Sequence, residues 1–157
     1  MRTRHNSVHH PFTLVELLAV IGILLLLVAL TVGGLNFAAA KADHSKTLAI
    51  MTEFEMALDA FKADYGYYPI QSTAGPINFS DSIWDNFKNK NSNNKKGRPY
   101  MEGDLTGTLQ DAYGNEFQYS CPGTHNTAKF DLWSYGKDGK SSNDDERADD
   151  IANWKQN

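Results

Sequence analysis

One uncharged apolar segment constrains this chain more than any other feature. From Leu17 to Leu35 the sequence contains no charged residue and no proline. As an α-helix, a segment of this length extends for about 28 Å, which is close to the hydrocarbon thickness of a bilayer. The segment is therefore predicted to form a transmembrane helix, and the polar chain that follows is long enough for one modest domain.

A short polar leader, MRTRHNSVHHP, precedes the apolar run, which begins at Phe12 and carries one acid, Glu16. Pro11 suits the entry to a helix, because its missing N–H would have no partner there. Arg2 and Arg4 lie on the N-terminal side and predict that the N-terminus is cytoplasmic. An ordinary secretory signal does not fit, because its apolar region is only about 7–15 residues long and ends in small residues.

A second helical stretch follows the apolar run and is amphipathic. Its apolar residues recur at spacings of three and four and fall on one stripe, which is typical of a helix packed against a sheet. The stripe consists of Met51, Phe54, Leu58, Phe61 and Tyr65. Gly66 and Pro69 indicate where the helix ends. Together the two stretches predict one helix of about 50 residues, roughly 75–80 Å long.

The C-terminal half carries strand patterns. The segments EFQYS (116–120) and KFDLWSY (129–135) flank a turn near Asn126, which favours an antiparallel pair. Residues 70–97 are predicted to be loop-rich, with a short helix over 83–88. Residues 136–154 are acidic and rich in turn formers. The chain is therefore predicted to have an α+β fold.

Composition excludes several classes of function. The net charge of −4 and the absence of any basic cluster longer than Lys95-Lys96 argue against a nucleic-acid partner. A single cysteine, Cys121, excludes an internal disulfide and a cysteine-based metal cluster. The histidines have no spacing typical of a metal or catalytic site. Since no Ser–His–Asp order, phosphate-binding loop or paired-carboxylate pattern is found, the chain is predicted not to be an enzyme.

The string FTLVELL, residues 12–18, closely resembles the processing signal of type IV pilins and type II secretion pseudopilins. The resemblance implies cleavage between Pro11 and Phe12 by a prepilin peptidase and methylation of the new amine. It also implies that Glu16, the fifth mature residue, neutralises the terminal amine of a neighbouring subunit during assembly. Such pairing is physically reasonable, because a buried carboxylate and ammonium together cost far less than either alone.

Two features at this site leave alternatives open. The peptidase of this family expects glycine where this chain has Pro11. An acid in the position of Glu16 is also favoured simply by the positive end of the helix dipole, and its side chain can reach water.

A second motif, SYGKDGKSSNDDERADDIANW (134–154), resembles the C-terminal calcium loop of major type II pseudopilins. The resemblance implies that Asp138, Asp149 and Asp150 bind calcium through their side chains and Tyr135 through its backbone carbonyl. Calcium prefers six to eight oxygens from carboxylates and carbonyls, and this segment is rich in both. The loop is longer than the usual family spacing, so a contribution from Asn143, Asp144 or Asp145 stays open. The alternative is a solvated acidic tail.

A third stretch, DAYGNEFQYS (111–120), resembles the family's turn that leads into a strand, and YGYYP (65–69) occupies the place of its post-helix segment. The resemblance therefore covers residues 12–69 and 98–154. It implies a type IV pilin-like fold, with a long N-terminal helix on a small antiparallel sheet and a structural calcium loop.

The resulting interpretation divides the chain into three parts. Residues 1–11 are a leader, 12–36 a transmembrane and filament-core helix, and 37–157 a periplasmic globular domain. The resemblance implies a precursor in the inner membrane that assembles with copies of itself, with minor pseudopilins and with an inner-membrane platform to help export folded proteins. The alternatives are a type IV pilus pilin, or a membrane-anchored calcium-binding or interaction domain that does not assemble.

Overall fold

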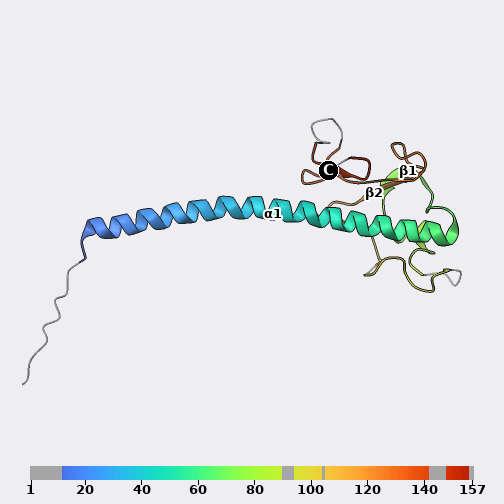
Figure 1. Ribbon diagram of the computed structural model, residues 1–157, viewed down its shortest axis with the longest axis horizontal. Coiled ribbons are helices and arrows are strands. Elements are labelled where there is room, and N and C mark those ends of the chain that lie inside the picture. The colour runs from blue at the N-terminus through green and yellow to red at the C-terminus, as the bar shows by residue number, and fades with distance from the viewer. Residues whose placement is uncertain (1–11, 90–93, 104, 142–147, 156–157) are drawn as a thin grey trace, which may run out of the picture. The chain divides into compact units, whose positions relative to one another are not determined.

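The computed structural model describes residues 12–89, 94–103, 105–141 and 148–155, without the side chains of residues 31–36. The chain divides into two compact units between Ala40 and Lys41. The predicted domain boundary between residues 36 and 37 stays a prediction. One helix, α1, runs from Leu14 to Tyr65 and spans 52 residues, which confirms the predicted long helix (Figure 1).

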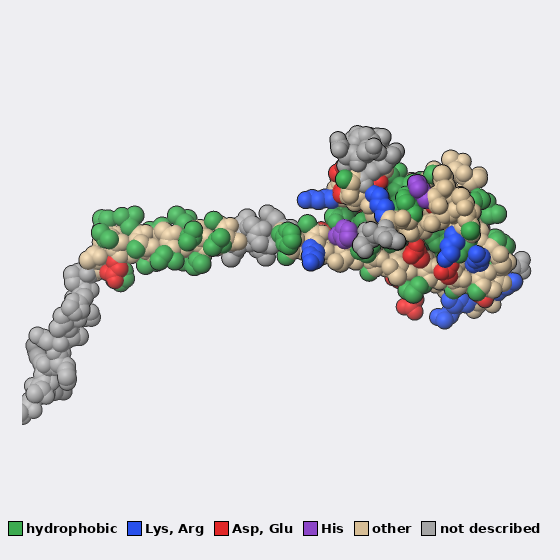
Figure 2. Space-filling view, turned by 45° about the horizontal axis from the view of Figure 1, so that its top comes forward, with side chains coloured by type: hydrophobic (Ala, Val, Ile, Leu, Met, Phe, Trp, Pro, Cys, Tyr) green, Lys and Arg blue, Asp and Glu red, His purple; other side chains and the backbone are tan. Residues whose placement is uncertain are grey.

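The first unit consists of the N-terminal part of α1. Thr13 caps the helix, because its side-chain oxygen accepts a hydrogen bond from the backbone N–H of Glu16 at 3.3 Å. The large apolar residues from Phe12 to Leu30 are all exposed in the isolated chain. Figure 2 shows hydrophobic side chains along the visible face of this part of the helix.

Among the residues that the structure describes, no helix has both the length and the hydropathy needed to cross a membrane.

The second unit contains a four-stranded antiparallel sheet in the order β1-β2-β3-β4. Strand β1 covers Gln71–Pro76, β2 covers Gln118–Cys121, β3 covers Asp131–Ser134 and β4 covers Ile151–Ala152. Strands β2 and β3 confirm the predicted antiparallel pair. Strand β1 lies in a segment predicted to be loop, and the predicted helix over 83–88 is instead a 3-10 turn, η1, at Ser82–Trp84.

The core of the second unit lies between the C-terminal turns of α1 and the sheet. The predicted stripe is buried at Met51, Phe54, Leu58 and Phe61, and Tyr65 packs against its margin. The segment between β1 and β2 adds further aromatic rings, among them Trp84, 5.7 Å from Phe54 between ring centroids. This burial supplies the apolar driving force that keeps an otherwise polar segment in place.

The helix ends as the sequence indicates. Gly66 has a φ of +86° and donates its N–H to the carbonyl of Lys62 at 2.7 Å, a typical left-handed C-terminal cap. Pro69 then carries the chain away from α1, and its carbonyl accepts a hydrogen bond from the Tyr119 hydroxyl at 2.8 Å. The first strand therefore starts beside β2, to which it pairs.

Candidate functional site

The predicted processing and assembly residues lie around the start of α1. Phe12 is 72% exposed, and Glu16 is exposed in the first turn of the helix. Pro11 lies outside the described residues. Thr13 and Glu16 have the Thr-x-x-Glu spacing of a capping box, a signal of the helix start that sequence reasoning missed. The cap fixes the first turn and so sets the direction in which the Glu16 carboxylate leaves the helix.

The large apolar side chains described around and after Glu16 are exposed in the isolated chain. Leu14, Val15, Leu25 and Leu30 are each at least 66% exposed. A helix that is apolar on all sides is stable in water only when other helices or lipid cover it. This part of α1 is therefore expected to associate with other helices or with lipid.

The second candidate site is the acidic loop after β3. The start of this loop contacts the turn at residues 111–115. In that turn, the Asp111 carboxylate accepts the backbone N–H groups of Tyr113 and Asn115, both at 2.8 Å. The Ser134 hydroxyl donates to the same carboxylate. Asn115 also donates its side-chain N–H to the carbonyl of Gly136 at 2.6 Å. The predicted structural turn is thus confirmed, and it anchors the start of the loop.

Two of the predicted calcium ligands lie in direct contact. The Asp149 carboxylate accepts the backbone N–H of Asp138 at 3.0 Å, which joins the two ends of the loop. The Asp138 carboxylate is exposed and accepts the N–H of Lys140 at 2.9 Å. Gly136 has a φ of +64°, and a Cβ there would overlap the carbonyl oxygen of Asp149. The close approach of the two ends therefore requires glycine.

Among the predicted ligands that the structure describes, Asp150 is the most buried, at 9% exposed. Its Oδ2 accepts a hydrogen bond from the Ser141 hydroxyl at 2.6 Å. Its Oδ1 is buried and has no hydrogen-bond partner within the part of the chain that the structure describes. Burial, together with the nearby charges of Asp149 and Asp138, raises the pKa of the Asp150 carboxyl, against the opposing effects of Ser141 and Lys155.

The remaining predicted ligands are placed as follows. Tyr135 directly follows β3, and burial of its ring, together with the charges of Asp150 and Glu116, raises the pKa of the phenol. Asn143, Asp144 and Asp145 lie outside the described residues. Within residues 12–89, 94–103, 105–141 and 148–155, no three His, Cys, Asp or Glu side chains gather closely enough to hold a metal ion. The calcium assignment stays a prediction.

A group of contacts that no sequence pattern indicated fixes residues 153–154 after β4. Asn153 accepts hydrogen bonds through its side-chain oxygen from Asn126 and from the N–H of Leu132, both at 3.1 Å. The Trp154 ring stacks on the His125 ring, with 4.1 Å between the ring centroids and an angle of 2° between the ring planes. Both contacts join residues far apart in sequence, so no local pattern could reveal them. His125 serves here as a packing partner.

A long N-terminal helix with an apolar first part, followed by a small antiparallel sheet with an acidic C-terminal loop, defines the pilin-like class of assembly subunit. Comparison with known families specifies the class further, because the family model "Type II secretion system (T2SS), protein G" matches residues 36–154. This chain belongs to that family.

Individual relatives agree with the family match. The chain is 35% identical to "Type II secretion system core protein G" of Aeromonas hydrophila, over 98% of this chain and 96% of that protein. It is 34% identical to the protein of the same name from Pseudomonas aeruginosa, over 98% and 99% of the two chains. A crystal structure of the major pseudopilin from enterohaemorrhagic Escherichia coli is similar at 23% identity and a TM-score of 0.43, covering 76% of this chain and 93% of that one.

Proposed function

We propose that this chain is a structural subunit of a type II secretion pseudopilus and acts by assembly rather than by covalent chemistry. The observation that carries the proposal is the exposed apolar helix from Phe12 to Leu30, joined to a domain with its own core. Helices of neighbouring copies would cover one another's apolar side chains, at about 25 cal/mol for each Å² removed from water. Family membership favours this role over that of a surface pilin.

The proposal includes a membrane-bound precursor. Residues 12–36 would hold the chain in the inner membrane, with the second unit in the periplasm, until a prepilin peptidase cuts before Phe12. The support is the uncharged sequence from Leu17 to Leu35 and the two arginines that precede it. Extraction with alkaline carbonate tests this step, and release of the uncut chain into the soluble fraction would contradict it.

Glu16 is proposed to pair with the terminal amine of a neighbouring subunit. Its carboxylate lies one turn from Phe12, on a helix that assembly would remove from water. Breaking a buried pair by removing one partner costs about 3–5 kcal/mol. We therefore expect Glu16→Ala to lower the filament yield by at least about tenfold while leaving the membrane-bound amount unchanged.

The assembly experiment compares Glu16→Ala with Glu53→Ala in cells, counting filaments by immunogold electron microscopy. Glu53 is an exposed acid on the same helix but lies in the second unit. Glu53→Ala is expected to assemble as the unchanged chain does. Normal filaments from Glu16→Ala would overturn the proposed role of the carboxylate, whereas loss of filaments from both variants would assign the effect to the helix as a whole.

We also propose that the C-terminal loop binds calcium through Asp138, Asp149, Asp150 and the carbonyl of Tyr135, with a further ligand from Asn143, Asp144 or Asp145. The unpartnered Oδ1 of Asp150 supports this assignment, because a buried carboxylate oxygen requires a hydrogen-bond donor or a cation. The remaining carboxylates lie at the joined ends of the loop. Bound calcium would neutralise their mutual repulsion and hold the loop closed.

Removal of calcium is expected to lower the melting temperature of the full-length protein by about 4 °C or more, because a ligand that binds only the folded state stabilises it. Melting curves are recorded in calcium, in magnesium and in EGTA. In Asp150→Asn, most of the difference in melting temperature between calcium and EGTA should disappear. In Asp81→Asn, at an exposed carboxyl away from the loop, the difference should remain. Equal melting temperatures of the unchanged chain in calcium and in EGTA would refute the proposal.

A further inference from the structure

A hollow of about 400 Å³ lies on the outer face of the sheet. Tyr119 and Leu132 are fully buried in the core, so their strand neighbours Ser120 and Trp133 face the opposite side of the sheet. Both neighbours line the hollow, together with Ala74 of β1. Its volume falls within the range of about 300–1,000 Å³ that is typical of small-molecule sites.

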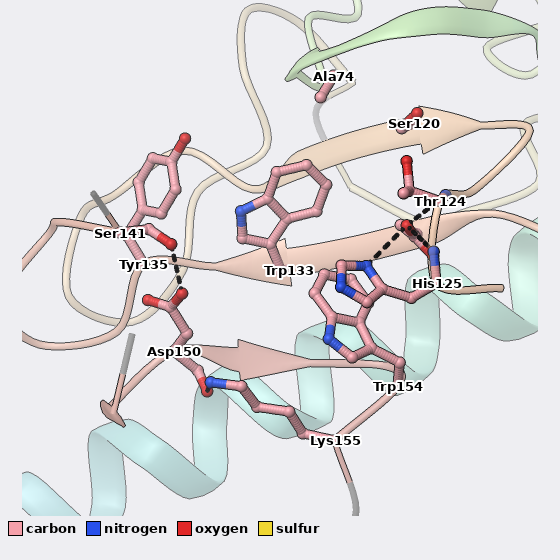
Figure 3. A pocket seen from close by; sticks show the side chains of 11 residues that line it. Ala74, Ser120, Thr124, His125, Trp133, Tyr135, Ser141, Asp150, Trp154 and Lys155 are labelled. Atoms are coloured by element: carbon pink, nitrogen blue, oxygen red, sulfur yellow. Dashed lines mark hydrogen bonds and ion pairs between the residues drawn. The ribbon is translucent and has the colours of Figure 1, made fainter. Parts of the chain in front are cut away.

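Aromatic rings form the walls of this hollow. Trp133 and Trp154 meet edge to face, with 5.7 Å between their ring centroids. Figure 3 shows Trp133 between Tyr135 on one side and the stacked rings of His125 and Trp154 on the other. Aromatic faces carry a partial negative charge and attract C–H groups and cations. The stack on His125 also holds the Trp154 ring in a fixed orientation.

Asp150 supplies an unused acceptor at one end of the hollow. Its carboxylate lies beside Ser141 and Tyr135 (Figure 3), and its buried Oδ1 has no partner among the described residues. The other carboxylate of the lining, Asp131, differs, because its two oxygens accept backbone N–H groups from Thr124, His125 and Asn126 at 2.6–2.8 Å. A ligand that enters this hollow is therefore expected to donate a hydrogen bond to Asp150.

The charges of the lining favour a neutral ligand. Lys155 also lines the hollow, and its ammonium lies 3.1 Å from the backbone carbonyl oxygen of Asp150. The ammonium would repel a cationic ligand, and the Asp150 carboxylate would repel an anionic one. The Asp131 carboxylate presents little charge to the hollow, because it is only 2% exposed and already accepts three backbone N–H groups. Hydroxyl groups of Ser120 and Thr124 add donors and acceptors without charge. The matching ligand has an apolar face and several hydroxyl groups.

We infer that this hollow binds a neutral carbohydrate. A sugar ring presents C–H groups on one face and would pack against Trp133, while its hydroxyl groups donate to the Asp150 carboxylate and accept from the ammonium of Lys155. The inference does not depend on filament assembly. It is also compatible with calcium, since a carboxylate offers about four lone-pair sites.

The test titrates the full-length protein with maltotetraose, cellotetraose and chitotetraose by isothermal calorimetry and tryptophan fluorescence. A polyoxyethylene detergent is used, because a glycoside detergent would itself offer sugar rings. Of the three tryptophans in the chain, Trp84 is fully buried in the core, so a fluorescence change reports on the two that line the hollow. We expect saturable binding of at least one tetrasaccharide, with a Kd of about 0.01–1 mM.

Two matched variants locate the binding. Ala74→Phe places a ring in the hollow, whereas Thr73→Phe adds the same ring at the neighbouring exposed position, which does not line it. Ala74→Phe should weaken binding at least about tenfold and Thr73→Phe less than about twofold. Absence of saturable binding for all three sugars would overturn the inference. Unchanged affinity in a folded Ala74→Phe protein would also overturn it, because the sugar would then bind elsewhere.

Discussion

Two glycines with similar backbone angles have different structural roles. Gly66 and Gly136 both have positive φ, at +86° and +64°. A Cβ on Gly66 would meet nothing within 4 Å, whereas a Cβ on Gly136 would overlap the backbone of Asp149. Substitution at Gly66 therefore costs only the left-handed backbone conformation, but substitution at Gly136 also forces the two ends of the acidic loop apart.

Alanine substitutions separate these two costs. Gly66→Ala is expected to lower the free energy of unfolding by about 1–2 kcal/mol, the usual cost of a left-handed residue with a side chain. Gly136→Ala is expected to lower it by about 3 kcal/mol or more, because steric overlap adds to that cost. Chemical denaturation of the two full-length variants measures the difference. Equal losses would mean that the loop ends separate at no cost, contrary to the close approach at Asp149.

At the scale of elements, one carboxylate organises the connection between β2 and β3. Asp131, 2% exposed, accepts the backbone N–H groups of Thr124, His125 and Asn126 and contacts the His125 ring nitrogen at 3.1 Å. Burial alone would raise the pKa of this carboxyl, but the hydrogen bonds from His125, Asn126 and Thr124 outweigh it and hold the pKa below its usual range. Through His125, the same carboxylate supports the packing of Trp154.

Asp131→Asn is expected to lower the free energy of unfolding at pH 7 by about 2–3 kcal/mol, because charge-assisted hydrogen bonds are lost. Since the folded-state pKa is depressed, the contribution of Asp131 is fully present above the unfolded-state pKa of about 3.9 and disappears as pH falls through the folded-state pKa. Chemical denaturation between pH 7 and pH 3 should therefore show that the free energy of unfolding falls more steeply with acid for the unchanged chain than for Asp131→Asn.

Asp81→Asn serves as the control for this measurement, because Asp81 is exposed and makes no side-chain capping hydrogen bond. Its pH profile is expected to follow that of the unchanged chain. If Asp131→Asn had the same profile as this control, the carboxylate would not be the group that stabilises the connection.

The elements that sequence reasoning predicted are those with a local signal. The helix stripe at Met51, Phe54, Leu58 and Phe61 has a helical period, and β2 and β3 lie within the aromatic-rich segments 116–120 and 129–135. Strand β1, QSTAGP, has neither, because its strand form depends on pairing with β2. Strand β4 has only two residues and forms against β3.

The candidate sites likewise divide into those with a local sequence signal and those without one. The motifs at Glu16 and at residues 134–154 were recognised from the sequence, because they are contiguous. The role of Asp131 and the stack of His125 on Trp154 were not, because the first needs a folded connection and the second joins positions far apart in the chain. Tertiary contacts of this kind leave no periodic pattern.

At the scale of the whole molecule, the two units have complementary properties. The second unit buries its aromatic residues in a core of its own, whereas the described side chains of α1 up to Leu30 remain exposed in the isolated chain. A large exposed apolar surface of this kind indicates that another surface covers this part of α1 in the functional state. Assembly into a filament supplies that surface from identical copies, which is the central claim of the proposed function.

The identity of the N-terminal residue in the assembled protein tests this claim most directly. A subunit that leaves the membrane for a filament must first lose its polar leader, so the protein from a sheared filament fraction is expected to begin at Phe12. Intact-mass measurement and N-terminal peptide sequencing determine this residue. A chain that retains Met1 to Pro11, in cells with an active prepilin peptidase and with no filament fraction, would contradict assembly and indicate a permanent anchor.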